Sequence, residues 1–142
     1  DLNHVRLGLH DYMRLLEAAA IDCCGAFGVR AERDRSATGV WVPRSGEHGH
    51  GAPSAKVCAM GVRVRRWVSL HGLALNVTTD LEHFSLIVPC GLIGRQVTSL
   101  QRELGPKCPS MDTVKSAMVA ALIEYLLRAL HAAEHARAGT GS

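Results

Sequence analysis

The chain has 142 residues, of which 47% are hydrophobic and 20% are charged, as is ordinary for one globular domain with a buried core. Its net charge of +3 and aromatic content of 4% argue against a nucleic-acid surface that stacks bases. No unbroken apolar run approaches the ~20 residues of a membrane span, so we expect neither nucleic acid nor a membrane as a partner.

The N-terminus and the cysteines indicate the kind of chain and its compartment. The first residues, DLNHVRLGLH, contain no initiator Met and lack the charged-then-apolar layout of a secretory signal. We therefore expect a processed, cut or partial chain. The five cysteines are an odd number in a chain that does not need disulfides to fold, which favours free thiols in a reducing compartment.

Two helices are predicted from apolar residues that recur at three- and four-residue steps. The first runs from Leu7 to Phe27. The second runs from Met111 to Glu134 and starts at a cap on Ser110 or Asp112. The apolar faces comprise Leu9, Tyr12, Leu15, Leu16, Ala19, Ala20, Cys23 and Phe27 on the first helix, and Val114, Met118, Ala121, Leu122, Tyr125, Leu126 and Ala129 on the second.

Between the helices, runs rich in β-forming residues predict strands. After a charged loop at 31–38, a short strand at Gly39–Val42 is expected to pair with a strand at Lys56–Val64 as a hairpin. The two are joined at 43–55 by a segment whose Gly, Pro, Ser and His content predicts a flexible loop. A further strand is predicted at Leu70–Val77.

No internal repeat or interdomain linker interrupts the chain. Residues 1–142 are therefore expected to form a single α+β domain, in which helices flank a mixed β-sheet, with a frayed tail at 135–142. Within the predicted loop, His48 and His50 carry the imidazoles that zinc binds, but no Cys-x-x-Cys pair lies nearby. We expect a solvated loop and no metal site.

Cys90 and Lys56 are the candidate catalytic residues. Cys90 lies between Pro89 and Gly91, on a turn where a thiol can approach a substrate. A free thiol, with a pKa near ~8.5, is mostly protonated at neutral pH, and a nearby ammonium stabilises the thiolate. Lys56 would supply this charge and, as the free amine, would shuttle the proton.

Residue chemistry alone leaves other interpretations of these residues open. Cys90 would be an inert, packed thiol if no charge lies near it. Alternatively, His71 would act as a general base toward Cys90, as in a thiol hydrolase, although no local signature of that class is present. Arg63 and Arg65 alternate with valines and predict a basic strand face, which would be solvated surface or a docking site for an acidic protein or an anionic substrate group.

Five ordered motifs lie between Gly39 and Leu100: GVWV, KVCAMGVRVRRW, SLHGLALNV, IVPCGLIG and VTSL. Together they resemble the C-terminal half of the lipoyl(octanoyl) transferase family, in particular its animal mitochondrial form. The resemblance implies the α+β fold of biotin and lipoate ligases, with Cys90 as the acyl-thioester nucleophile and Lys56 as the residue that tunes its thiol. It also implies that six residues bind the acyl substrate: Ala59, Met60, Gly61, Gly72, Leu73 and Ala74.

The resemblance further implies a reaction and its partners. Octanoyl would move from acyl carrier protein through a Cys90 thioester to a lysine of a lipoyl domain. The acceptors would be the E2 subunits of 2-oxoacid dehydrogenases and the glycine cleavage H protein. This scheme needs no ATP, no metal and no other cofactor, and the resemblance implies a mitochondrial location.

One part of the family's pattern is absent. Nothing in Asp1–Val42 matches its upstream Arg-Gly-Gly…His-Gly-Pro-Gly-Gln segment, so we expect a partial catalytic domain that lacks its N-terminal portion. A catalytically inactive fragment that only binds the carrier or acceptor therefore stays an alternative. An ATP-dependent lipoate or biotin ligase is a further alternative, against which Cys90 argues because such ligases need no thiol nucleophile.

Overall fold

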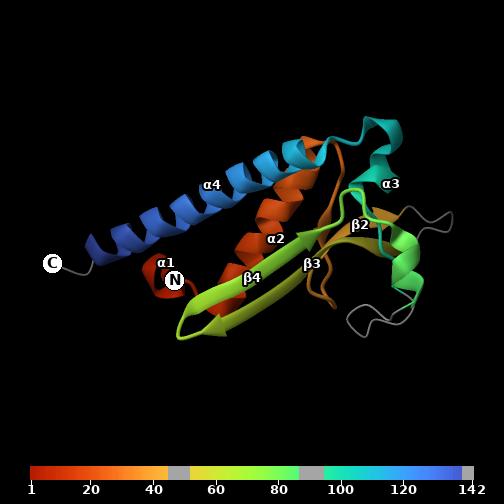
Figure 1. The fold of residues 1–142 in the computed structure, drawn as a ribbon. Helices are drawn as coiled ribbons and strands as arrows, with labels where there is room; N and C mark the ends of the chain where they lie inside the picture. Colours follow the sequence, from red (N-terminus) through yellow and green to blue (C-terminus); the bar gives the residue numbers. More distant parts are fainter. Residues whose placement is uncertain (45–51, 87–94, 139–142) are drawn as a thin grey trace.

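The fold combines helices with one β-sheet (Figure 1). The structure is a computed structural model and describes residues 1–44, 52–86 and 95–138. Its elements are, in chain order, α1 (Leu2–Val5), α2 (Leu9–Ala26), β1 (Glu32–Arg33), β2 (Val40–Arg44), β3 (Ala52–Arg65), β4 (Val68–Leu75), the 3-10 helix η1 (Leu81–Leu86), α3 (Leu100–Leu104), the 3-10 helix η3 (Gly105–Lys107) and α4 (Met111–Ala138). This mixture confirms the predicted α+β class.

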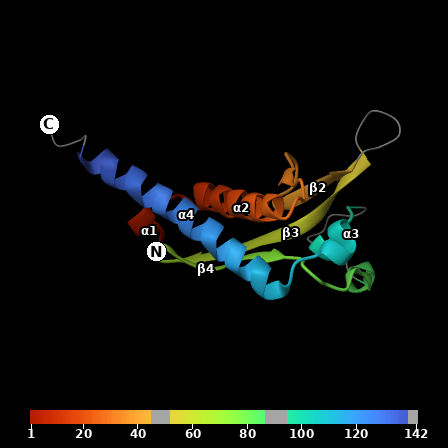
Figure 2. The ribbon, with the colours of Figure 1, turned by 90° about the horizontal axis from the view of Figure 1, so that it is seen from above.

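The described strands pair in the order β1-β2-β3-β4, and every neighbouring pair is antiparallel. α2 packs against the sheet, and α4 packs against α2 (Figure 1 and Figure 2). The core lies between α2, the middle strands and the start of α4. The prediction of a mixed sheet needs a correction, because parallel pairing among the described residues is limited to an isolated bridge between Lys56 and Val97.

Three segments that were predicted as loop or tail contain regular structure. β1 pairs with β2 inside the segment predicted as a charged loop. The sequence does not predict this strand, because two residues are too few to show a periodicity. Strand pairing between Arg44 and Ala52 occupies both ends of the predicted loop at 43–55, whose middle lies outside the described residues. α4 continues through 135–138, where fraying was predicted. Composition indicates a loop or tail without fixing where hydrogen bonding stops.

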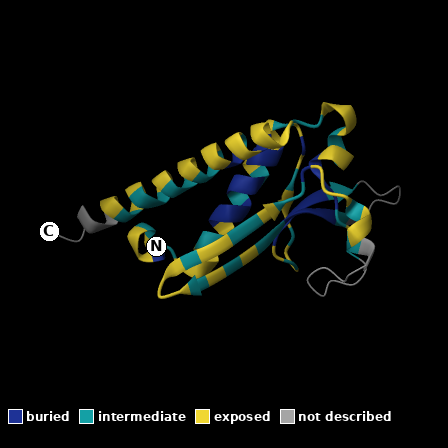
Figure 3. Cartoon of the chain, in the orientation of Figure 1, coloured by how far each residue is buried: buried dark blue, intermediate teal, exposed yellow. Residues whose placement is uncertain are grey.

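Among the α4 residues whose burial the structure describes, only residues of the first turns are buried. Val114 and Met118 belong to the core, whereas the later residues of the predicted stripe are half-buried, and much of the helix surface is exposed (Figure 3). By length and mean hydropathy alone, Met111–His135 is apolar enough to cross a membrane, which a search for unbroken apolar runs missed. Length and composition do not distinguish a membrane span from a surface helix, so the absence of a membrane partner stays a prediction.

A buried carboxylate joins α2 to the strands. Glu17 is 1% exposed, and its Oε2 accepts hydrogen bonds from Arg14 Nη1 at 2.7 Å and Arg33 Nε at 3.1 Å. Its Oε1 accepts from the backbone N–H of Gly39 at 3.1 Å. Because a buried charge is costly unless it is paired, both arginines compensate the charge of this carboxylate inside the fold.

Replacing Glu17 by Ala is expected to destabilise the fold by about 2 kcal/mol. The main cause is the buried Gly39 N–H, which loses its acceptor, since both arginines are exposed enough to turn to water. Glu17→Gln should cost less, because its amide oxygen still accepts from Gly39. Urea unfolding measures both, with the exposed Glu32→Ala as control. Equal costs for Glu17→Ala and Glu32→Ala would contradict the prediction.

Candidate active site

Lys56 owes its orientation to an irregularity in the pairing of β2 with β3. Val40 pairs with Cys58 and Trp41 pairs with Lys56, so one step on β2 matches two steps on β3, and Val57 is the extra residue of a β-bulge. Neighbouring residues on β2 point to opposite faces of the sheet, so their partners do too. Cys58 therefore joins the core beneath α2, and Lys56 faces the other side with Trp41.

The side chain of Lys56 is held closely by its neighbours. It is 8% exposed, and its Nζ lies 4.7 Å from the centroid of the Trp41 ring, within cation–π range. A β-carbon placed on Gly39 would lie 3.2 Å from Lys56 Cε, so the glycine leaves the space that the lysine stem occupies. Among the residues that the structure describes, no carboxylate forms a salt bridge with this ammonium.

The chain that follows the Pro-Cys-Gly segment, described from Arg95 onward, runs beside Lys56. Where β4 ends, residues 96–98 become the neighbour of β3: the Lys56 N–H donates to Gln96 O at 2.8 Å, and the Thr98 N–H donates to Lys56 O at 2.9 Å. Cys90 itself lies outside the described residues, which resume at Arg95. Its pairing with Lys56, and the alternative pairing with His71, stay predictions.

Arg95 is anchored beside the same ring. Its Cζ lies 4.5 Å from the Trp41 centroid, and its Nη2 forms a 2.6 Å salt bridge with Asp34. Hydrogen bonds from the Ser36 hydroxyl and backbone N–H, followed by the bond and charge of Arg95, lower the pKa of Asp34 to about 2. Asp34 is therefore ionised across the physiological range and neutralises Arg95.

Three of the other thiols are unsuited to nucleophilic chemistry. Burial raises the pKa of Cys58 to about 12, and burial together with the neighbouring Cys23 raises that of Cys24 to about 12. Burial also raises the pKa of Cys23. Neutral thiols without access to solvent are inert, so these cysteines pack as small apolar residues. Cys108 is half-buried.

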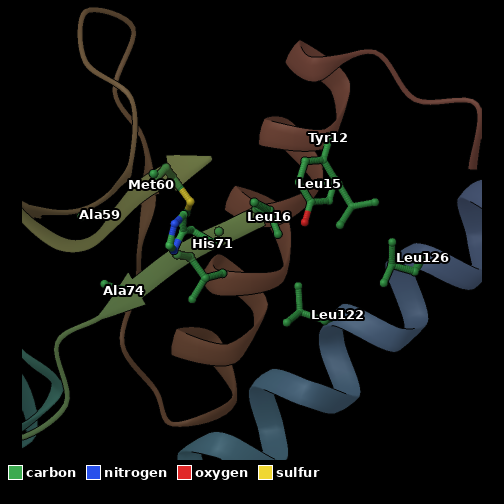
Figure 4. Close-up of a pocket in the computed structure, with 12 residues that line it drawn as sticks. Tyr12, Leu15, Leu16, Ala59, Met60, His71, Ala74, Leu122 and Leu126 are labelled. Atoms are coloured by element: carbon green, nitrogen blue, oxygen red, sulfur yellow. The ribbon is translucent and has the colours of Figure 1, made fainter. Parts of the chain in front are cut away.

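The six residues expected to bind the acyl substrate lie together on the β3–β4 hairpin. Its register pairs Ala59 with Ala74, Met60 with Leu73 and Gly61 with Gly72. All six line an apolar pocket of about 680 Å³ between the hairpin, α2 and α4 (Figure 4). Lys56 does not line this pocket, so the structure groups the six with one another and places the lysine at a separate, neighbouring position on β3.

Other residues of this region were not predicted from the sequence as pocket residues. The remaining pocket lining is His71 and five residues from the helices: Tyr12, Leu15, Leu16, Leu122 and Leu126. The helical five belong to the predicted apolar stripes, but periodicity cannot distinguish a pocket wall from a core face. Trp41 and Arg95 were not predicted as neighbours of Lys56, because neither has a local motif.

Two further predictions have different outcomes. Along β3, Arg63 and Arg65 are exposed while the valines between them are half-buried, so the basic strand face is present and its use for docking stays a prediction. Among the described residues, no group of three or more His, Cys, Asp or Glu side chains is placed to hold a metal ion. His48 and His50 lie outside the described residues.

Comparison with known families gives the class of protein first. Residues 1–123 match the family model described as the lipoyl protein ligase A/B catalytic domain. The match covers most of the chain, including β3, β4, Lys56 and Cys90. The chain therefore belongs to the lipoyl protein ligase A/B catalytic domain family.

Individual relatives narrow the comparison. The chain is 46% identical over 127 residues to an octanoyltransferase of Bacteroides fragilis. The aligned region covers 89% of this chain and 55% of that protein. The chain is 48% identical over 119 residues to an octanoyltransferase of Bacteroides thetaiotaomicron, and this alignment covers 83% of this chain and 49% of that protein. It is 44% identical over 120 residues to an octanoyltransferase of Christiangramia forsetii, with 84% of this chain and 49% of that protein covered. The chain thus spans about half the length of the curated relatives it matches.

Proposed function

We propose that this chain carries the acyl-transfer chemistry of an octanoyltransferase in lipoate biosynthesis. The Cys90 thiolate attacks the thioester carbonyl of octanoyl-acyl carrier protein, forms an octanoyl thioester and releases the carrier thiolate, which takes up a proton. The amine of an acceptor lysine then attacks this thioester, forms an amide and returns the thiol of Cys90. Lys56 stabilises the thiolate of Cys90 and transfers the proton between steps.

The observation that carries the proposal is the placement of Lys56. Lys56 is 8% exposed and has no carboxylate partner among the described residues, so its ammonium is not paired with an acid in the described part of the site. The backbone carbonyl of Gln96 accepts a hydrogen bond from the Lys56 N–H, and Gln96 is six residues from Cys90 in the chain. Six residues span at most about 20 Å, so this tether supports Cys90 as the group that Lys56 acts on.

The hairpin supports an acyl substrate. The pairs Ala59–Ala74 and Gly61–Gly72 place small residues opposite each other, which leaves space and exposes backbone amides to a ligand. The pocket beside them is lined mainly by apolar side chains and has a volume typical of small-molecule sites. This combination suits the thioester end of a fatty acyl group and its hydrocarbon tail.

Donor, acceptor and location belong to the proposal as well. Acyl carrier protein would be the donor, and lipoyl domains of E2 subunits or of glycine cleavage H protein would be the acceptors. A mitochondrial location stays a prediction from the sequence resemblance, because the relatives reported above are bacterial proteins. The alternative is an inactive fragment that retains only binding, which the experiment below distinguishes from an active transferase.

The intact mass of the chain after mixing with octanoyl-acyl carrier protein tests the proposal. We expect a gain of one octanoyl group, mapped to Cys90 by peptide mass and removed by hydroxylamine. Cys90→Ser should abolish the gain, and Cys108→Ser should leave it unchanged. A label on Cys58, or one that persists in Cys90→Ser, would contradict the proposal. Carrier binding without any acylation would instead support the inactive fragment.

A further inference from the structure

We infer that Trp41 is a positioning residue for Lys56: the indole ring holds the ammonium in place without neutralising it. The inference rests on the proposed function, in which Lys56 acts through its charge. The bulge at Val57 makes Trp41 and Lys56 cross-strand partners, with Nζ 4.7 Å from the ring centroid. An ammonium within about 6 Å of an indole face is attracted by the negative face of the ring.

The ring is itself fixed. Trp41 is 0% exposed, and its Nε1–H donates to Ala37 O at 3.1 Å. Arg95 lies over the same ring at 4.5 Å and is anchored by Asp34 and by the Ser36 hydroxyl, at 2.6 Å and 3.0 Å. A buried aromatic ring with its polar hydrogen satisfied and a second cation packed on it has little freedom to move, so it defines where the ammonium can lie.

The charges around Lys56 explain why an indole ring, and not a carboxylate, holds its ammonium. Three acidic groups of this region are paired with arginines: Glu17 with Arg14 and Arg33, Asp34 with Arg95, and Glu103 with Arg44. Glu32, the cross-strand partner of Trp41, is exposed to solvent and forms no salt bridge with Lys56. Cys58, two residues along β3, is a neutral thiol whose pKa is raised by burial. A carboxylate beside Lys56 would compensate its charge, whereas an indole ring attracts the ammonium and leaves the charge available to a thiolate.

The test measures the rate at which iodoacetamide alkylates Cys90 as a function of pH, in the full chain with Cys108→Ser. Trp41→Leu should raise the pH midpoint by about half of the shift that Lys56→Met causes, because the charge is retained but no longer held. Trp41→Phe, which keeps a smaller ring, should raise it less. Trp67 lies in the β3–β4 turn and is 54% exposed, so Trp67→Leu and Trp67→Phe are matched controls expected to leave the midpoint unchanged.

A double variant separates positioning from a structural role. If Trp41 acts through Lys56, Trp41→Leu should add no further shift of the midpoint in the Lys56→Met background, whereas a purely structural effect would shift the midpoint equally in both backgrounds. An unchanged midpoint in folded Trp41→Phe and Trp41→Leu, or equal shifts with and without Lys56, would overturn the inference. An unchanged midpoint in Lys56→Met alone would instead contradict the proposed function.

A second measurement needs no Trp41 variant. In the folded chain, ring current from the indole should move the NMR signals of the Lys56 ε-protons upfield of those of Lys107 and Lys115. Loss of the shifted signal in Lys56→Arg would assign it. Unshifted ε-protons for all three lysines would overturn the inference whatever the activity of the chain.

Discussion

Lys56→Met is expected to slow the alkylation of Cys90 at pH 7 about tenfold, and the rate should recover at high pH. Alkylation follows the thiolate fraction, and loss of a positive charge raises the pKa of a nearby thiol, so the pH midpoint moves upward. Met replaces most of the apolar stem that packs against Gly39 and Trp41, so the effect reports charge more than packing. Octanoyl transfer should fall by about 10²-fold or more, within the range of acid–base contributions.

Lys56→Arg separates charge from proton transfer. Guanidinium keeps the positive charge, so Cys90 should remain reactive toward iodoacetamide at neutral pH. It cannot release and retake a proton at working pH, so octanoyl transfer should fall nearly as far as in Lys56→Met. Lys115→Met, on an exposed part of α4, is the matched control and should change neither measurement. A Met variant with an unchanged alkylation midpoint would show that Lys56 does not tune Cys90.

Local patterns allowed much of the fold to be predicted. The 3.6-residue periodicity of α2 and α4 and the strand-like runs of β2, β3 and β4 placed these elements within a few residues. The same patterns misjudged α4, because the predicted buried stripe runs along a helix in which, among the residues whose burial is described, only Val114 and Met118 are buried. Burial depends on what packs against a helix, which apolar periodicity does not specify.

The candidate site was harder to predict because it depends on register. Lys56 was proposed from its chemistry and from the resemblance, but its orientation depends on the bulge at Val57, which has no residue signature. The contact of residues 96–98 with β3 joins segments about forty residues apart, beyond any local pattern. The sequence predicted Trp41 only as part of a strand, whereas the strand register places its ring against the Lys56 ammonium.

Gly39→Ala is expected to destabilise the fold by about 3 kcal/mol and to displace Lys56. Gly39 has a φ of +125°, in a region that residues with a β-carbon avoid. The added carbon would lie 2.8 Å from Cys58 O, which belongs to the backbone of β3, and 3.2 Å from Lys56 Cε. Backbone strain and overpacking each contribute roughly 1–3 kcal/mol. Because the lysine stem must move, Cys90 should also lose reactivity toward iodoacetamide at pH 7.

Two other glycines allow the strain to be separated from the contact. Gly28 also has a positive φ, +83°, but a β-carbon there meets nothing within 4 Å, so Gly28→Ala measures strain alone. Gly25 lies inside α2 without such a φ and without close neighbours, so Gly25→Ala should be neutral or stabilising by up to ~1 kcal/mol. Urea unfolding ranks the three variants. If Gly39→Ala costs no more than Gly28→Ala and leaves Cys90 as reactive as before, Gly39 does not hold the lysine in place.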